Sequence, residues 1–140
     1  ITILFLSLTS YAQSWQTNFE EAQQEALRDN KKIILVFSGS DWCGPCIKLE
    51  KQIWESDYFK AYAKEHYVLL RANFPRLKKN KLSKSQQEHN NRLAETYNPR
   101  GYFPYVVVLD KNANTLGSTG YKKVSPEDYV NYLEKISNDG

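Results

Sequence analysis

The chain has 140 residues, of which 41% are hydrophobic and 25% are charged, a composition that is typical of one globular domain and excludes collagen-like repeats and wholesale disorder. The 19 basic and 16 acidic residues give a net charge of +3, which is too small to indicate nucleic acid, so no nucleic-acid partner is expected. Two cysteines are too few for a scaffold held by several disulfides.

The first twelve residues are predicted to be a targeting signal. Residues 1–8, ITILFLSL, are apolar apart from two hydroxyl residues, and this run is too short to span a bilayer, which takes about 20 residues. Followed by the small residues Ser10 and Ala12, it is typical of a secretory signal. We therefore interpret residues 1–12 as a signal peptide remnant, cleaved after Ala12, and expect export to the periplasm. A hydrophobic terminal strand or an uncleaved anchor is the alternative.

Residues 13–140 are predicted to form one domain in which helices and strands alternate. Asn18 and Glu21 form a capping box at the start of the first helix. The apolar stripe of this helix is predicted to comprise Phe19, Ala22, Ala26 and Leu27. The continuous apolar run at 33–37 is typical of a strand that is buried on both faces.

A loop of small residues at 38–41 leads into WCGPC and a helix that runs to about Trp54. Ser56 is predicted to cap the next helix, and residues 67–73 the next strand. Another buried strand is expected at 105–109, followed by a turn and a short strand from 115 to about 118.

The segment at about 75–92 is polar and interrupts this pattern. Its first half is rich in basic residues, namely Arg76, Lys78, Lys79, Lys81 and Lys84. One interpretation is a solvated insertion and helix face, and the other is a docking patch for an acidic partner. Leu93, Ala94 and Tyr97 indicate a helix that ends at Asn98-Pro99. The last helix begins at Ser125-Pro126, so one layered α/β structure accounts for the chain.

Cys43 and Cys46 lie between a predicted buried strand and a helix, where a CxxC pattern is typical of a redox motif. The free N–H groups of the helix N-terminus would stabilise a thiolate at Cys43. Cys46, one turn inside, is expected to be more sheltered and to attack a mixed disulfide formed at Cys43. Pro45 suits the first helical turn, since its missing N–H costs little there, and Trp42 would form an aromatic wall beside the nucleophile.

Other roles for the cysteine pair are less well supported. A structural disulfide over so short a loop would remove little entropy from the unfolded chain. A zinc site needs about four ligands, and only His66 and His89 remain as candidates, without metal-type spacing. Copper handling stays open as a side role, whereas haem attachment would need a histidine where Ile47 stands.

The segment IILVFSGSDWCGPC at 33–46 resembles the active site of the thioredoxin family, and GYFP at 101–104 followed by YVVVLD resembles its second signature, in which a cis proline precedes the central strand. The resemblance covers about residues 19–136. The run DWCGPCIKLEKQIWES at 41–56 more closely resembles exported members of the family such as the C-terminal domain of the thiol-disulfide interchange protein DsbD. This implies a thioredoxin-like α/β fold, a central mixed sheet flanked by helices.

The resemblance also implies roles for single residues. Cys43 would be the attacking thiol and Cys46 the resolving thiol. Pro104 would lie across from the disulfide and leave the Phe103 backbone free to pair with a substrate strand. Trp42, Phe103 and Pro104 are therefore predicted to bind substrate.

One departure from the family concerns proton transfer. Thioredoxins carry a buried aspartate six residues before the first cysteine, and Phe37 stands at that position here. The proton of the resolving thiol must therefore pass to another group or to water. The candidates are Glu50, one turn beyond Cys46, and Asp41, just before Trp42. The basic segment 76–84 is also extra, which puts the usual cytosolic reductase partner in doubt.

By resemblance, the function is that of an exported thiol-disulfide oxidoreductase that reduces protein disulfides. Gly44-Pro45 between the cysteines favours a reductant such as thioredoxin, near about −270 mV, over an oxidant such as DsbA, near about −120 mV. The expected partners are disulfide-bearing proteins and a membrane electron donor of the DsbD type. A disulfide oxidase or isomerase, or a binding or copper-handling module without turnover, is the alternative. We expect a monomer with no cofactor or metal besides the Cys43–Cys46 disulfide.

Overall fold

The computed structural model describes residues 14–138, so the predicted leader lies outside the described residues. Five strands form one sheet in the order β1-β3-β2-β4-β5. β2 (Lys32–Ser38) pairs in parallel with β3 (Tyr67–Asn73), which pairs in parallel with β1 (Trp15–Gln16). β4 (Tyr105–Leu109) is antiparallel to both β2 and β5 (Thr115–Thr119). This is the predicted mixed sheet.

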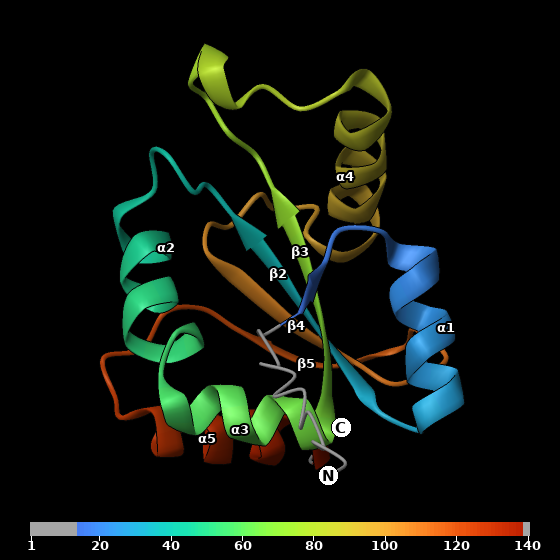
Figure 1. Ribbon diagram of the computed structural model, residues 1–140, viewed down its shortest axis with the longest axis vertical. Coiled ribbons are helices and arrows are strands. Elements are labelled where there is room, and N and C mark those ends of the chain that lie inside the picture. Colours follow the sequence, from blue (N-terminus) through green and yellow to red (C-terminus); the bar gives the residue numbers. More distant parts are fainter. Residues whose placement is uncertain (1–13, 139–140) are drawn as a thin grey trace, which may run out of the picture.

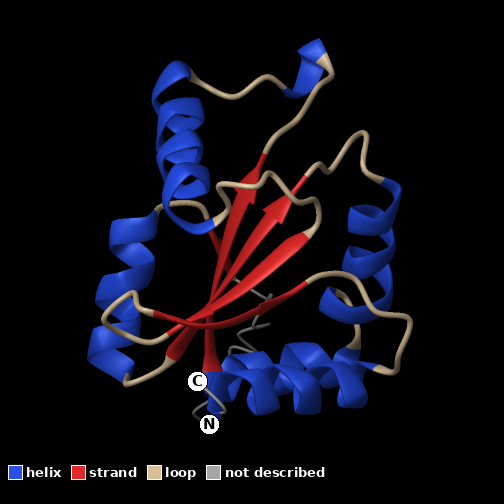
Figure 2. Ribbon diagram, turned by 180° about the vertical axis from the view of Figure 1, so that it is seen from behind, coloured by secondary structure: helices blue, strands red, loops and turns tan. Residues whose placement is uncertain are grey.

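Helices cover both faces of the sheet (Figures 1 and 2). α1 (Phe19–Asp29) and α4 (Lys84–Tyr97) pack on one face. The other face carries α2 (Gly44–Leu49), the π-helix η1 (Glu50–Trp54), α3 (Asp57–His66) and α5 (Pro126–Asn138). Within residues 14–138, no helix has the length and apolar character needed to cross a membrane.

β2 is the central strand, and its side chains alternate between two hydrophobic cores. Ile34 and Val36 contribute to the core beneath α3 and α5, whereas Ile33, Leu35 and Phe37 contribute to the core beneath α1 and α4. All five side chains are buried. The unbroken apolar run therefore forms a strand covered on both faces, as its sequence predicts.

The first helix begins at its predicted cap but buries less than predicted. The Asn18 side chain accepts a hydrogen bond from the backbone N–H of Glu21 at 3.0 Å. Ala22 and Ala26 are fully buried, whereas Leu27 is 48% exposed. The prediction that Leu27 joins the apolar stripe was wrong, because one further residue turns the side chain by about 100° around the helix.

Two segments are organised differently from the sequence prediction. The polar segment at 75–92 is a loop with one turn of 3₁₀ helix, η2 (Lys78–Asn80), followed by the first half of α4. α4 begins well before its apolar residues because the Ser83 hydroxyl caps it, accepting from the N–H of Gln86 at 3.2 Å. The helix expected to run to about Trp54 changes at Glu50 from an α-helix to a π-helix.

Candidate active site

Cys43 and Cys46 are joined by a disulfide at the N-terminus of α2, with their Cα atoms 5.2 Å apart. Cys43 is the N-cap residue, and its Sγ accepts a hydrogen bond from the N–H of Cys46 at 3.2 Å. The N–H of Gly39 donates to the Sγ of Cys46 at 3.5 Å. Each sulfur therefore has a backbone donor, and the helix N-terminus adds its positive end, which is the environment that stabilises a thiolate.

Burial does not separate the two cysteines in this oxidised state. Cys43 is 4% exposed and Cys46 is 3% exposed, so the two differ by very little, and the prediction that Cys46 is the more sheltered thiol stays a prediction. An N-cap side chain folds back over the first turn of its helix in order to reach a backbone N–H. Cys43 does this, and its sulfur is covered along with that of Cys46.

Gly39 holds the segment before the cysteines in a tight turn. Its carbonyl accepts from the N–H of Trp42 at 3.2 Å and from the N–H of Cys43 at 2.9 Å. A side chain at Gly39 would overlap the indole ring of Trp42. The indole can lie against this backbone only because residue 39 is glycine, a role that the sequence prediction missed.

Trp42 connects the cysteine segment to two other loops. Its Nε1–H donates to the carbonyl of Phe74 at 2.7 Å, and the Arg76 guanidinium lies 3.6 Å from the centroid of the indole ring. The ring of Phe103 packs edge-on against the same indole at 5.4 Å. The next residue, Pro104, is buried and follows a cis peptide bond. The predicted substrate-binding residues Trp42 and Phe103 are thus brought into contact.

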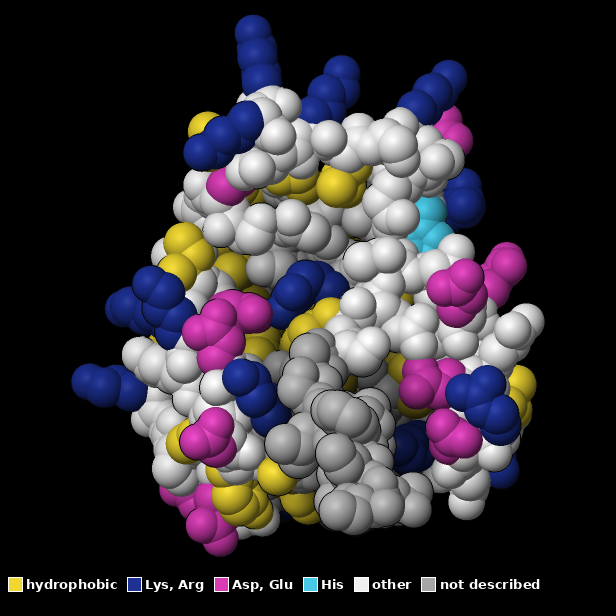
Figure 3. All heavy atoms as spheres, in the orientation of Figure 1, with side chains coloured by type: hydrophobic (Ala, Val, Ile, Leu, Met, Phe, Trp, Pro, Cys, Tyr) yellow, Lys and Arg dark blue, Asp and Glu magenta, His cyan; other side chains and the backbone are white. Residues whose placement is uncertain are grey.

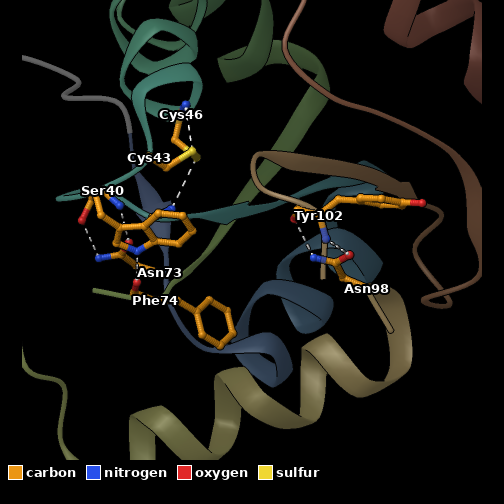
Figure 4. Close-up of a disulfide and its surroundings, with 9 residues drawn as sticks. Ser40, Cys43, Cys46, Asn73, Phe74, Asn98 and Tyr102 are labelled. Atoms are coloured by element: carbon orange, nitrogen blue, oxygen red, sulfur yellow. Dashed lines mark hydrogen bonds between the residues drawn. A yellow bond between two sulfur atoms is a disulfide. The ribbon is translucent and has the colours of Figure 1, made fainter. Parts of the chain in front are cut away.

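The loop before Phe103 is held by Asn98, which the sequence prediction treated only as a helix end. The side chain of Asn98 is buried; it donates to the carbonyl of Tyr102 at 2.9 Å and accepts from the N–H of Tyr102 at 3.0 Å (Figure 4). Gly101 takes a φ of 71° within this loop, a conformation that favours glycine. In the sequence, the asparagine directly before Pro99 was the signal that could have indicated this role.

Asp41 contacts the polar loop that follows β3. Its carboxylate accepts from the N–H groups of Arg76 and Leu77, at 2.9 and 3.1 Å, and from the side chain of Asn80 at 3.0 Å. These hydrogen bonds, the one from Arg76 foremost, lower the pKa of Asp41. Such a carboxylate is a weak base, so the geometry disfavours the predicted role in proton transfer. Asp41 instead fixes the start of the loop.

Glu50 and Cys46 line the same pocket of about 350 Å³ beside the disulfide. The Oε2 atom of Glu50 accepts from Nη2 of Arg71 at 2.5 Å, and the Arg71 guanidinium also lies 4.4 Å from the ring centroid of Trp15. Arg71 was missed at the sequence level, although it is the single charge within β3. Phe37 is fully buried in the opposite core, where it provides no proton acceptor.

The histidines have contacts of their own. His89 Nε2 accepts from the N–H of Phe19 at 2.9 Å, and the ring of His66 stacks on that of Tyr62 at 4.1 Å. Across the part of the chain that the structure describes, there is no cluster of three or more His, Cys, Asp or Glu side chains that could hold a metal ion.

Known proteins share this sequence pattern and this geometry. A family model described as thioredoxin-like matches residues 14–111. The chain is 34% identical over 120 residues to the disulfide bond reductase DsbH of Chlamydia pneumoniae. This alignment covers 86% of this chain and 70% of that protein. A solved structure of a DsbH oxidoreductase matches with a TM-score of 0.81 at 31% identity, covering 89% of this chain and 83% of the other.

The oxidised C-terminal domain of DsbD from Neisseria meningitidis is a more distant match. Its TM-score is 0.55 at 16% identity, and the alignment covers 84% of this chain and 90% of the domain. At this identity the likeness concerns the fold alone.

Proposed function

This chain belongs to the thioredoxin-like family, and on that premise we propose that it is an exported thiol-disulfide oxidoreductase that reduces protein disulfides. The proposal rests on one observation above all. The Cys43–Cys46 disulfide lies at a helix N-terminus, where each sulfur accepts a backbone hydrogen bond. The name of the relative from Chlamydia pneumoniae, a disulfide bond reductase, supports the same direction.

The proposed reaction begins from the dithiol form. The Cys43 thiolate attacks one sulfur of a substrate disulfide, so that a mixed disulfide forms and the first substrate thiolate leaves and takes up a proton. Cys46 then loses its proton and attacks the sulfur of Cys43. The Cys43–Cys46 bond forms, and the second substrate thiol is released. Two electrons pass to the substrate, and the pair ends as a disulfide.

We propose Glu50 as the group that accepts the proton of Cys46. Both residues line one pocket. Its volume of about 350 Å³ and the polar side chains of Ser40 and Asn73 in its lining give room and partners for water between them. Arg71 keeps the Glu50 carboxylate in place through a 2.5 Å hydrogen bond. Glu50 would thus perform the task that thioredoxins assign to the position of Phe37.

The direction of electron flow is the finer part of the proposal. Gly44-Pro45 between the cysteines favours a reductant. An exported reductant works in a compartment that is kept oxidising, so it needs a donor, and we propose a membrane protein of the DsbD type. The apolar residues at 1–8 support export. A disulfide oxidase or isomerase would use the same two cysteines with a less stable disulfide.

The deciding measurement is the reduction potential of the Cys43–Cys46 pair in glutathione buffers. We expect a value near about −270 mV, close to that of thioredoxin. A value between about −120 and −180 mV would contradict the reductase proposal and favour an oxidase or isomerase. Insulin reduction with a dithiol donor gives the second readout, because a binding module would show no turnover above the uncatalysed rate.

A further inference from the structure

The positive charge of the chain is concentrated in the loop between β3 and α4 and at the first residue of α4. Residues 76–84, the basic loop, hold five of the 19 basic residues and none of the 16 acidic ones, which leaves 14 basic and 16 acidic residues elsewhere. The five are Arg76, Lys78, Lys79, Lys81 and Lys84. All five side chains are exposed, and dark blue side chains stand out around this loop at the top of Figure 3.

The four lysines of the basic loop have no partner of their own. Among residues 14–138, none of the four forms an ion pair or a side-chain hydrogen bond. The carboxylate of Asp41, which contacts the same loop, accepts instead from the N–H groups of Arg76 and Leu77 and from the Asn80 side chain. No described carboxylate is therefore within ion-pair distance of these ammonium groups, which leaves them available to attract an external anion.

The basic loop is held in a fixed position beside the disulfide. Ser40 donates its N–H to the Asn73 side chain at 3.1 Å and accepts from it through Oγ at 2.8 Å (Figure 4). The N–H of Phe74 donates to the carbonyl at the end of β2 at 2.8 Å. Arg76 stacks on the indole of Trp42, the residue before Cys43. The loop thus begins at the wall of the active site itself.

We propose that the basic loop is a docking surface for acidic polypeptide segments that flank a substrate disulfide. The inference rests on the proposed function and names its substrate class. Charges held at one side of a reactive site raise the encounter rate of partners of opposite charge, within a range of about 8 Å at physiological salt. Leu77, which is 47% exposed between the cations, offers an apolar contact to a polypeptide as well.

A polypeptide suits this place better than a lipid surface. The loop and the disulfide are joined through Trp42 and Asp41, so a membrane that covered the loop would also obstruct the cysteines. An acidic segment of the substrate itself would instead bring its disulfide to Cys43. The attraction between the basic loop and the acidic segment therefore acts on the same molecule whose disulfide reacts.

The experiment uses two peptides with the same internal disulfide, one flanked by glutamates and the other by glutamines. The reduced protein is mixed with each peptide at low and high salt, and the bimolecular exchange rate is measured after acid quenching. We expect the acidic peptide to react about tenfold faster at low salt, with the advantage shrinking as salt increases.

A pair of double variants assigns the effect to the loop. Lys79→Gln/Lys81→Gln should reduce the advantage of the acidic peptide about threefold and leave the glutamine peptide unchanged. The matched control, Lys60→Gln/Lys135→Gln, removes two exposed lysines on α3 and α5 and the same net charge, and should keep the advantage. A loss of equal size in both double variants would overturn the assignment to the loop.

The outcomes separate this inference from the proposed function. If both peptides react at equal rates with the natural chain, the docking inference is overturned and the reductase proposal stands. If neither peptide is reduced, the proposed function fails first. If the peptides react equally while sedimentation with phosphatidylglycerol vesicles requires Lys79 and Lys81, the loop binds anionic lipid instead and the inference is likewise overturned.

Discussion

Phe37 shows at the scale of one residue how a task can move to another part of the fold. Its phenyl ring is fully buried, and its centroid lies 6.5 Å from that of the Phe74 ring. A phenyl ring accepts no proton. Glu50 begins the π-helix that continues from the helix of Cys46, and both residues line one pocket. π-Helices occur frequently at functional sites, and Glu50 is the first residue of one.

Replacing Glu50 by glutamine should slow the second exchange step. With no carboxylate to accept the proton of Cys46, its attack on the mixed disulfide at neutral pH should fall about 10- to 100-fold. The measurement is the pH–rate profile of substrate release in a single turnover. Glu55→Gln is the control, since Glu55 lines the same pocket. Superposable profiles for Glu50→Gln and the natural chain would exclude Glu50 from proton transfer.

Serine at either cysteine should separate the two thiol roles. Cys46→Ser keeps the attacking thiol but cannot resolve the intermediate, so a mixed disulfide with the substrate should accumulate. Cys43→Ser should accumulate far less, because it lacks the thiol that the helix N-terminus stabilises. Intact-protein mass spectrometry distinguishes the two. Equal trapping by both variants would contradict the assignment.

At the scale of elements, the site is built where strand ends converge. β2 and β3 are parallel, so their carboxyl ends meet at one edge of the sheet. β4 runs the opposite way, so its amino end and the loop with Phe103 arrive at the same edge. α2 follows β2 after the short turn at residues 39–43, which places the cysteines there as well. Three loops from distant parts of the chain therefore meet around Trp42.

A methyl group should destabilise the chain at Gly39, in the turn after β2, and be tolerated at Gly44, the first residue of α2. Gly39→Ala places Cβ on the Trp42 indole and should destabilise the chain by about 1–3 kcal/mol, as overpacking does. Gly44→Ala meets nothing within 4 Å and should leave stability nearly unchanged. Urea unfolding of both variants tests this, and similar midpoints would contradict the close packing at Gly39.

The hydrogen bonds that attach the basic loop to Asp41 should depend on pH. Hydrogen bonds lower the pKa of Asp41, so its contribution is fully present above the ordinary value near 3.8 and is lost as the pH falls through the lowered one. The amide NMR signals of Arg76 and Leu77 should therefore shift together with a midpoint below 3.8. In Asp41→Ala this transition should vanish, while the amide of Asn114, which bonds Asp110, keeps its own. Persistence of the Arg76 and Leu77 transition in Asp41→Ala would contradict the attachment.

For the whole molecule, the sheet divides the hydrophobic interior into two cores that lie on opposite faces. The core under α3 and α5 contains Trp54 and Tyr129, and burial raises the pKa of the Tyr129 phenol. The other core lies under α1 and α4. The active site draws on both sides of the sheet, since α2 packs on one core and Phe103 on the other. Its geometry therefore depends on the packing of both cores.

The losses of unfolding free energy caused by one truncation in each core should be additive. Leu133→Ala on α5 and Leu93→Ala on α4 should each cost about 2–5 kcal/mol, and the double variant should equal their sum within about 0.5 kcal/mol, because the residues share no packing partner. Urea unfolding gives the three free energies. A clear departure from additivity would show that the sheet transmits strain between its faces.

Local signals in the sequence determine most of the secondary structure and the chemical motif. The apolar runs at 33–37 and 105–109, the caps at Asn18 and Ser56 and the CxxC spacing each act within a few residues, so they can be interpreted without the fold. The thioredoxin-like fold could be predicted because these signals occur in a characteristic order.

Tertiary structure decided which distant residues meet. Asp41 contacts Arg76, 35 residues away, and Glu50 bonds Arg71 on another element. The two-residue strand β1, which pairs with β3, was equally beyond prediction. No local period encodes such contacts, because they form only after parallel and antiparallel strands bring their ends to one edge of the sheet.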